Sequence, residues 1–388
     1  MKKSKHHRHI LFLSLIETMW RIPLLATLLL ALPLTPAQAD WPLVRGDAQA
    51  SGTASCTLPA NPKVMWKFSR PEAGFEATAL LVNGILYVGD TEGTFYAFRL
   101  SDGKLAWAES FKESGFLAGA AYANKCLIVC DLYGVVRCLA SDTGELLWKQ
   151  ETDAEIYAAP NVIEDQVLVT TESGDLLTFQ FDTGEPSWKF HIEAPLRCWP
   201  AVAKGRVLLA GCDERLHAVD STTGQESGGI DIAGPTGCTP ALLGNHVYFG
   251  TELGIFYAMH ASTMQMAWQF HDPKRSHPIR TAAAINEHIV VFGNQGKQVY
   301  ALHPDSGELL WQFAARSRVE SSPVIVNDRA WVATRRGRLH ALDLKTGKSV
   351  WRYDAGGGFI ASPAVADQRL VIGNEDGTLY CFGEKSGL

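Results

Sequence analysis

The sequence has little of several features that mark common protein classes. Cysteine accounts for 8 of 388 residues, which is ordinary usage and excludes a small disulfide-stabilised domain. Positive charge is not in excess, since the formal net charge is −6 at pH 7. This balance excludes a strongly basic nucleic-acid-binding protein. Hydrophobic residues make up 46% of the chain and aromatic residues 10%, which excludes a disordered chain.

A hydrophobic run long enough to cross a membrane is also missing. The apolar run from Ile22 to Leu34 is too short to span roughly 30 Å of hydrocarbon. Basic residues precede it, and the small-residue stretch Thr35-Pro36-Ala37-Gln38-Ala39 follows it. This order predicts a signal peptide over residues 1–39, with translation starting at Met1 or Met19. We therefore expect an exported chain, periplasmic or extracellular, with no transmembrane segment in mature residues 40–388.

Motifs of the common catalytic and metal sites are absent from the sequence. We find no Cys-x-x-Cys-His for haem, no zinc-ligand spacing, no Ser-His-Asp arrangement and no glycine loop for phosphate. The sequence therefore predicts no metal site and no catalytic residues of these kinds. The eight cysteines leave two alternatives open, either disulfides formed after export or small buried thiols.

A tryptophan repeat organises the chain. Tryptophans recur at intervals of 40 to 43 residues, with one double interval of 80, at Trp66, Trp107, Trp148, Trp188, Trp268, Trp311 and Trp351. A turn that usually ends in glycine precedes each position by four residues. Gly228 stands where the double interval lacks a tryptophan. This irregular unit indicates either decay of the repeat or a weakened seam that a partner uses.

Each repeat contains four short runs rich in β-branched and aromatic residues, bounded by Gly, Asn or Asp. Four antiparallel strands repeated about every forty residues predict a β-propeller. Seven units are complete, and an eighth lacks its tryptophan strand. The spare strand Lys63-Val64-Met65-Trp66 supplies it, because closure leaves no open edge. We predict an all-β, eight-bladed propeller over residues 40–388, with the N-terminal strand closing the last blade and the tryptophans docking between blades.

The turn pattern resembles that of the quinoprotein-type (PQQ-like) repeat propellers. It reads Ala97-x5-Gly103-x3-Trp107 and recurs through Gly307-x3-Trp311 and Gly347-x3-Trp351. The opening Trp41-Pro42-x2-Arg45-Gly46-Asp47 also resembles the start of secreted members. The family includes pyrroloquinoline-quinone dehydrogenases with Ca²⁺ and non-catalytic propellers such as BamB. In size and blade count the chain is most similar to the non-catalytic branch.

Two functions follow from this resemblance. The first is a non-catalytic propeller without cofactor that binds a protein or a cell-envelope component, as a monomer and without nucleic acid. The chain lacks the adjacent cysteine pair of many quinoprotein dehydrogenases, although it also lacks a lipidation cysteine like that of BamB. The alternative is a dehydrogenase using PQQ and Ca²⁺. The resemblance would then imply Arg197 and Arg280 for the quinone carboxylates, and Glu76 or Glu320 near Ca²⁺.

The innermost strands align as eight five-residue segments from Phe75–Ala79 to Phe359–Pro363. Their second positions vary, and we expect them at the mouth of the central funnel. The candidate mouth residues are Glu76, Tyr157, Arg197, Trp199, Arg280 and Glu320. Two interpretations stay open: the charges pair with one another or with water, or the group binds an anionic ligand or a partner loop.

Loops on one predicted face differ in charge around the ring. Acidic residues gather in the first three units, at Glu72, Asp90, Glu92, Glu113, Asp131, Asp153, Glu155 and Glu172. Basic residues gather in the sixth and seventh, with Lys274, Arg275, Arg316, Arg318, Arg335 and Arg336 as the candidate partner-binding rim. The rim is either a set of solvated loops or a docking face for a dipolar partner.

Overall fold

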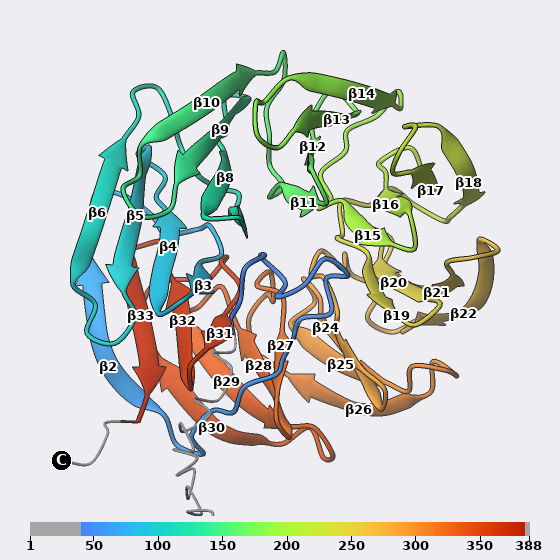
Figure 1. The fold of residues 1–388 in the computed structure, drawn as a ribbon. Helices are drawn as coiled ribbons and strands as arrows, with labels where there is room; N and C mark the ends of the chain where they lie inside the picture. The colour runs from blue at the N-terminus through green and yellow to red at the C-terminus, as the bar shows by residue number, and fades with distance from the viewer. Residues whose placement is uncertain (1–39, 385–388) are drawn as a thin grey trace, which may run out of the picture. The chain divides into compact units, whose positions relative to one another are not determined.

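The computed structural model describes residues 40–384, and the predicted signal peptide lies outside them. These residues form 33 β-strands and no helix. Thirty-two strands form eight antiparallel four-stranded sheets, and β1 (Thr53–Ala54) adds a parallel fifth strand to one of them. Figure 1 shows the sheets arranged as the blades of a propeller. The prediction of an eight-bladed all-β propeller is confirmed.

The blades are numbered here in chain order. Blades 1 to 4 are β3 (Leu80–Val82), β4 (Ile85–Gly89), β5 (Thr94–Arg99), β6 (Leu105–Ser110); β7 (Ala121–Ala123), β8 (Cys126–Cys130), β9 (Val135–Ala140), β10 (Leu146–Glu151); β11 (Asn161–Ile163), β12 (Gln166–Thr170), β13 (Asp175–Gln180), β14 (Pro186–His191); and β15 (Ala201–Ala203), β16 (Arg206–Ala210), β17 (Arg215–Asp220), β18 (Glu226–Asp231).

Blades 5 to 8 are β19 (Ala241–Leu243), β20 (His246–Gly250), β21 (Ile255–His260), β22 (Gln265–His271); β23 (Ala284–Asn286), β24 (Ile289–Gly293), β25 (Gln298–Leu302), β26 (Leu309–Ala314); β27 (Val324–Val326), β28 (Arg329–Ala333), β29 (Arg338–Asp343), β30 (Ser349–Asp354); and β31 (Ala364–Ala366), β32 (Arg369–Gly373), β33 (Thr378–Gly383) with β2 (Lys63–Ser69).

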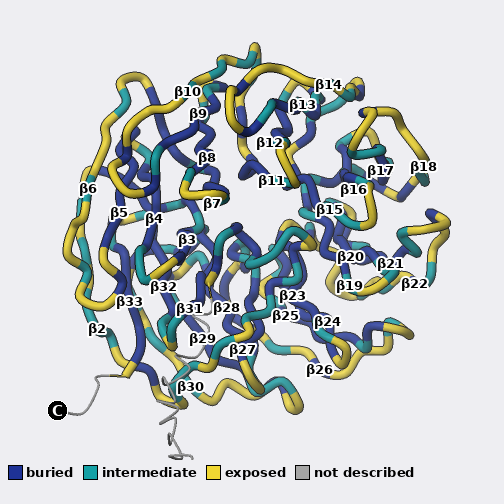
Figure 2. Tube along the Cα trace, in the orientation of Figure 1, coloured by how far each residue is buried: buried dark blue, intermediate teal, exposed yellow. Residues whose placement is uncertain are grey.

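The second and third strands of each blade form the core. β4 and β5 are almost wholly buried, whereas the outer β6 is mostly exposed, and Figure 2 shows this gradient around the ring. The neighbouring blades cover the apolar residues on both faces of these second and third strands. The continuous hydrophobic runs of the sequence therefore pack between sheets. The core therefore consists of the seams between blades.

Closure of the ring uses the N-terminal strand. β2 pairs antiparallel with β33, from Lys63 opposite Gly383 to Ser69 opposite Thr378. Figure 1 shows blue β2 beside red β33. The predicted closing strand is therefore confirmed, and the outer edge of β33 is not left unpaired.

The repeat tryptophans pack against the turns of the next blade. A Cβ added at Gly103 would lie 2.6 Å from the Trp66 ring, and the same close approach recurs at Gly144, Gly184, Gly224, Gly307 and Gly347. Each of these glycines has a positive φ. The indole N–H of Trp66 donates to the Leu100 carbonyl at 2.9 Å. The glycine therefore serves both the turn and the ring that lies on it.

The seam between blades 4 and 5 is built differently. Gly228 replaces the tryptophan, and Met264 replaces the glycine of the following turn, with a φ of 54°. A Cβ at Gly228 would lie 3.2 Å from Met264 Cγ, and Met264 is 7% exposed. Arg206 Nη1 donates to the Ala261 carbonyl at 3.1 Å, which is the position that an indole N–H would use. The large and small residues have exchanged blades, so the seam is filled and not simply decayed.

The segment before β2 crosses the propeller at its centre. Trp41 pairs with Leu81 and Leu43 with Ala121. Farther along, the carbonyls of Ala48, Gln49, Ser51 and Gly52 accept the backbone N–H groups of Val202, Leu242, Ile285 and Ile325. Residues 41–54, here called the crossing segment, thus bond to the inner strands of six blades.

Candidate mouth and central channel

The loops that enter each inner strand lie beside the loops between the second and third strands. Backbone hydrogen bonds join them in every blade, for example Thr91 N–H to the Gly74 carbonyl and Arg335 N–H to the Arg318 carbonyl. These loops form one face of the propeller, called here the loop face. The crossing segment bonds to the end of each inner strand that lies farthest from the loop face. The central channel is therefore open at the loop face and floored by the crossing segment.

A central cavity of about 170 Å³ lies in this channel. It is lined mainly by second and fourth residues of the inner five-residue segments, because alternate residues of a strand point the same way. Among the predicted mouth residues, Glu76, Tyr157, Arg197 and Trp199 line it. Val44 and Arg45 of the crossing segment also line it.

A second cavity of about 430 Å³ opens beside the channel at blades 4 to 6. Arg197, Cys212, Pro235, Gly237, Glu252 and Arg280 line it. Gly237 is the second-position residue of blade 5, so it leaves space between the two arginines. The structure therefore brings Arg197 and Arg280 to one cavity, as their shared repeat position suggests.

Both arginines are held by glutamates of the preceding blade. Arg197 Nε donates to Glu172 Oε2 at 2.8 Å, and Arg280 Nε donates to Glu252 Oε1 at 2.8 Å. Hydrogen bonds donated to these glutamates raise the pKa of each guanidinium. The arginines are still about half exposed, at 54% and 56% of their side chains. Each arginine is therefore paired with a carboxylate but still accessible to a partner.

Glu320 and Glu76 lie near one basic residue at the other side of the mouth. Arg335 Nε lies 3.2 Å from Glu320 Oε2, and Arg335 Nη1 lies 2.9 Å from Glu375 Oε1. Burial raises the pKa of Glu76, and the nearby Glu375 carboxylate raises it further. Arg335 thus pairs with Glu320 and Glu375, whereas its charge lowers the pKa of Glu76 without an ion pair between them.

The two aromatic candidates differ in exposure. Tyr157 is 42% exposed, and its hydroxyl donates to Glu155 Oε2 at 2.8 Å. Trp199 is buried, and its indole N–H donates to the Pro160 carbonyl at 3.0 Å. Tyr157 is therefore available at the mouth, while Trp199 packs between blades 3 and 4.

The predicted rim cations lie on the loop face. Lys274, Arg275, Arg316, Arg318 and Arg336 are exposed, and Arg335 is half-buried. Among residues 40–384, none of the five exposed cations forms an ion pair, whereas Arg335 pairs with two glutamates. The rim is thus a basic arc over blades 6 and 7 with uncompensated charge.

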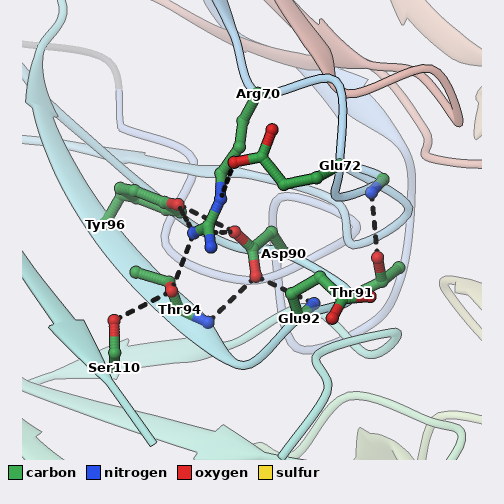
Figure 3. A network of polar contacts seen from close by, with 9 residues as sticks. Arg70, Glu72, Asp90, Thr91, Glu92, Thr94, Tyr96 and Ser110 are labelled. Carbon is green, nitrogen blue, oxygen red and sulfur yellow. Dashed lines mark hydrogen bonds and ion pairs between the residues drawn. The ribbon is translucent and has the colours of Figure 1, made fainter.

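The acidic side of the rim is smaller than the sequence suggests. Asp90 and Asp131 are fully buried, so the prediction that they contribute to the rim is wrong. Asp90 accepts the N–H groups of Glu92 and Thr94 and pairs with Arg70 Nη1 at 2.7 Å, as Figure 3 shows. Each aspartate closes the turn between the second and third strands, and a nearby arginine compensates its charge. Glu92, Glu113 and Asp153 remain exposed.

The quinone alternative does not fit these contacts. The two arginines that would bind quinone carboxylates already bind Glu172 and Glu252. Glu320, expected near Ca²⁺, pairs with Arg335. Within the described part of the chain, no group of three or more His, Cys, Asp or Glu is arranged to hold a metal ion. We therefore derive no step through a quinone.

Two further observations concern the rest of the molecule. All eight cysteines are free thiols, so the structure contains none of the disulfides considered above. In residues 40–384 there is no helix of the length and hydrophobicity that a membrane span requires.

Residues 107–237, 182–322 and 296–388 match the family described as outer membrane protein assembly factor BamB, and together they cover well over half of the chain. The chain belongs to the BamB family. No curated protein sequence matches it significantly.

Solved structures show the same fold as this BamB-family chain. BamB from Moraxella catarrhalis superposes with a TM-score of 0.73 at 18% identity, covering 84% of this chain and 99% of that chain. Quinohemoprotein alcohol dehydrogenase from Comamonas testosteroni superposes with a TM-score of 0.75 at 15% identity, covering 90% and 82%. At these identities the likeness concerns the fold alone.

The sequence analysis missed Arg45 as a channel residue. It lies in the opening motif Trp41-Pro42-x2-Arg45-Gly46-Asp47, outside the repeat, so alignment of the blades gives it no position. The available signal was a single arginine between small and apolar residues in a segment with no repeat partner.

Proposed function

We propose that the chain is an exported, non-catalytic scaffold that binds a protein partner through its loop face, without quinone or calcium. Membership of a family described as an outer membrane protein assembly factor supports a protein partner. The predicted signal peptide supports export.

The observation that carries the proposal is the contrast between two sets of cations on the loop face. The arginines at the mouth are paired with glutamates, whereas the exposed basic arc of Lys274, Arg275, Arg316, Arg318 and Arg336 has no ion pair within residues 40–384. Across the ring, Glu92, Glu113 and Asp153 are exposed and also unpaired in this region. Such separated charges would orient a partner with a complementary dipole and speed its association.

Crosslinking at the loop face tests the proposal. A photoreactive amino acid at position 318 should capture one partner protein in cells, whereas the same group at Lys345, in a turn on the opposite face, should not. The partner so identified is then titrated with the purified chain. Equal capture at both positions would contradict the proposed docking face.

The rate of association gives the quantitative test. Replacing Arg316 and Arg318 by Gln should slow association about tenfold at low salt, and the difference should shrink as salt rises. The matched control replaces Lys345 and Lys348 by Gln, which removes the same charge from the other face. An unchanged rate in the first variant at low salt would remove the electrostatic role of the arc.

A further inference from the structure

The crossing segment places a buried cation at the floor of the central cavity. Arg45 is 4% exposed, and its Nη2 donates to the carbonyls of Ala283 at 3.0 Å and Pro323 at 2.8 Å. Nε and Nη1 have no hydrogen-bond partner among the described residues. Since a guanidinium carries five N–H donors, three of them are left without an acceptor.

No carboxylate in the described part of the chain forms an ion pair with this charge. Within residues 40–384, Arg45 forms no ion pair, and the acid nearest in sequence, Asp47, is otherwise engaged. Its carboxylate accepts the N–H of Gln49 at 2.9 Å and the N–H and hydroxyl of Ser51. Burial lowers the pKa of Arg45 to about 10, although the nearby charge of Asp47 acts in the opposite direction, so the side chain is still charged at neutral pH. A buried charge without a counter-ion is unfavourable.

The walls of the cavity carry hydroxyl groups that each accept one backbone hydrogen bond. Thr78, Thr239, Ser322 and Ser362 occupy the fourth position of their inner segments and line the cavity. Each accepts the backbone N–H of the fourth residue in the preceding blade, at 3.0 to 3.2 Å. Since a hydroxyl has one hydrogen to donate, and none of the four donates to another described residue, these hydrogens are available to a ligand.

Size and shape limit what can enter. The cavity holds about 170 Å³, below the roughly 300–1,000 Å³ of sites for drug-sized ligands. It opens toward the loop face, where Glu76 and Arg197 line it, and the crossing segment closes its other end. The deep end therefore offers donors and positive charge.

We propose that the central cavity binds one small oxyanion, a carboxylate or a phosphate, above Arg45 and within the ring of channel hydroxyls. The anion would form the ion pair that Arg45 lacks among residues 40–384, accept its free N–H groups and accept the hydroxyl hydrogens. This site is separate from the basic arc and does not depend on the partner proposed above.

Calorimetric titration of the purified full chain with sodium acetate and with sodium phosphate, at constant ionic strength, tests the proposal. We expect saturable binding of one anion per chain, with the better probe identifying the carboxylate or phosphate class. Arg45→Met should weaken binding by on the order of tenfold or more. Lys345→Met, which removes one exposed positive charge from the opposite face, is the matched control and should bind as the unaltered chain does.

Arg45→Met could fail to fold, because Arg45 also bonds two blades. Ser322→Ala and Ser362→Ala keep the arginine and each remove one hydroxyl, so each should weaken binding severalfold in a folded protein. Absence of saturable binding by both probes would overturn the proposal. Unchanged affinity in the two serine variants, or in a folded Arg45→Met variant, would also overturn it.

Discussion

Among single residues, His340 shows how one repeat position can carry different chemistry. Tyrosine occupies the equivalent place in four other blades, at Tyr96, Tyr257, Tyr300 and Tyr380. His340 is 6% exposed, and only its Nδ1 has a partner, Ser349 Oγ at 3.2 Å. Burial lowers the pKa of His340 to about 4, and Arg352 and Arg338 add to this effect.

This histidine should make the fold sensitive to acid. Between pH 6.5 and about 4 the unfolded chain binds a proton at this residue while the native chain does not, so the free energy of unfolding falls as the pH falls. The loss is about 3 kcal/mol at most, at 1.36 kcal/mol per pKa unit. Urea unfolding at pH 7 and pH 4.5 should show a smaller acid loss for His340→Tyr than for the unaltered chain.

The exposed His288 gives the control for this experiment. His288→Tyr makes the same substitution at an exposed position, so it shows what the change of residue type does away from the buried site. If His340→Tyr and His288→Tyr lose equal stability on acidification, His340 is not the buried neutral group described here.

At the scale of the blade, the exchange between Gly228 and Met264 makes a test of seam packing. Met264→Gly should lower the free energy of unfolding by about 2 kcal/mol, since it removes a buried side chain. Gly228→Trp alone should also destabilise, because the ring would meet Met264. The double variant recreates the Trp-on-Gly contact of the other seams.

The double variant should therefore lose about 2 kcal/mol less unfolding free energy than the two single variants lose together. A double-mutant cycle on thermal or urea unfolding measures this difference. Additive effects would mean that the two positions are independent. They would then support the interpretation of blade 4 as simple repeat decay.

The blades also show which information the sequence carries. The spacing of tryptophans and glycines is enough to predict eight blades and the closing strand, because each blade repeats the same contacts. The seam exchange was not predictable in this way, since Gly228 and Met264 lie in different repeats and each one alone looks like a lost consensus residue. The ion pairs Arg197–Glu172 and Arg280–Glu252 join neighbouring blades, so the linear pattern does not reveal them either.

Burial of the acidic turn residues was missed for a related reason. Asp90 and Asp131 lie in polar turns that read as exposed, but each accepts backbone N–H groups of its own turn and an arginine covers it. Their carboxylates support the loops. They do not contribute to the charge that a partner would meet.

On the scale of the whole molecule, the crossing segment ties six blades together, and Gly52 is its tightest point. Gly52 has a φ of 61°, and a Cβ there would lie 1.9 Å from Arg45 Nη2. Gly205 has a similar φ of 74° but nothing within 4 Å of an added Cβ. Comparing alanine substitutions at the two glycines therefore separates the cost of a left-handed backbone from the cost of the steric clash with Arg45.

Gly205→Ala should cost about 1 kcal/mol of unfolding free energy, from the left-handed backbone alone. Gly52→Ala should cost roughly 2 kcal/mol more, because Arg45 must leave its two carbonyl partners. Thermal unfolding of both variants measures the difference. Equal costs would show that the crossing segment moves freely and does not hold the blades.

The closing pair of strands has a consequence for how the chain matures. Lys63 meets Gly383, so one of the earliest strands to be synthesised stays without its partner until the last one is complete. Contacts so distant in sequence form slowly, and an unpaired strand edge invites aggregation in the interval. If the chain is exported N-terminus first, as proposed above, it would therefore reach its destination with an unfinished ring. We expect it to need protection by a chaperone until its final strand emerges.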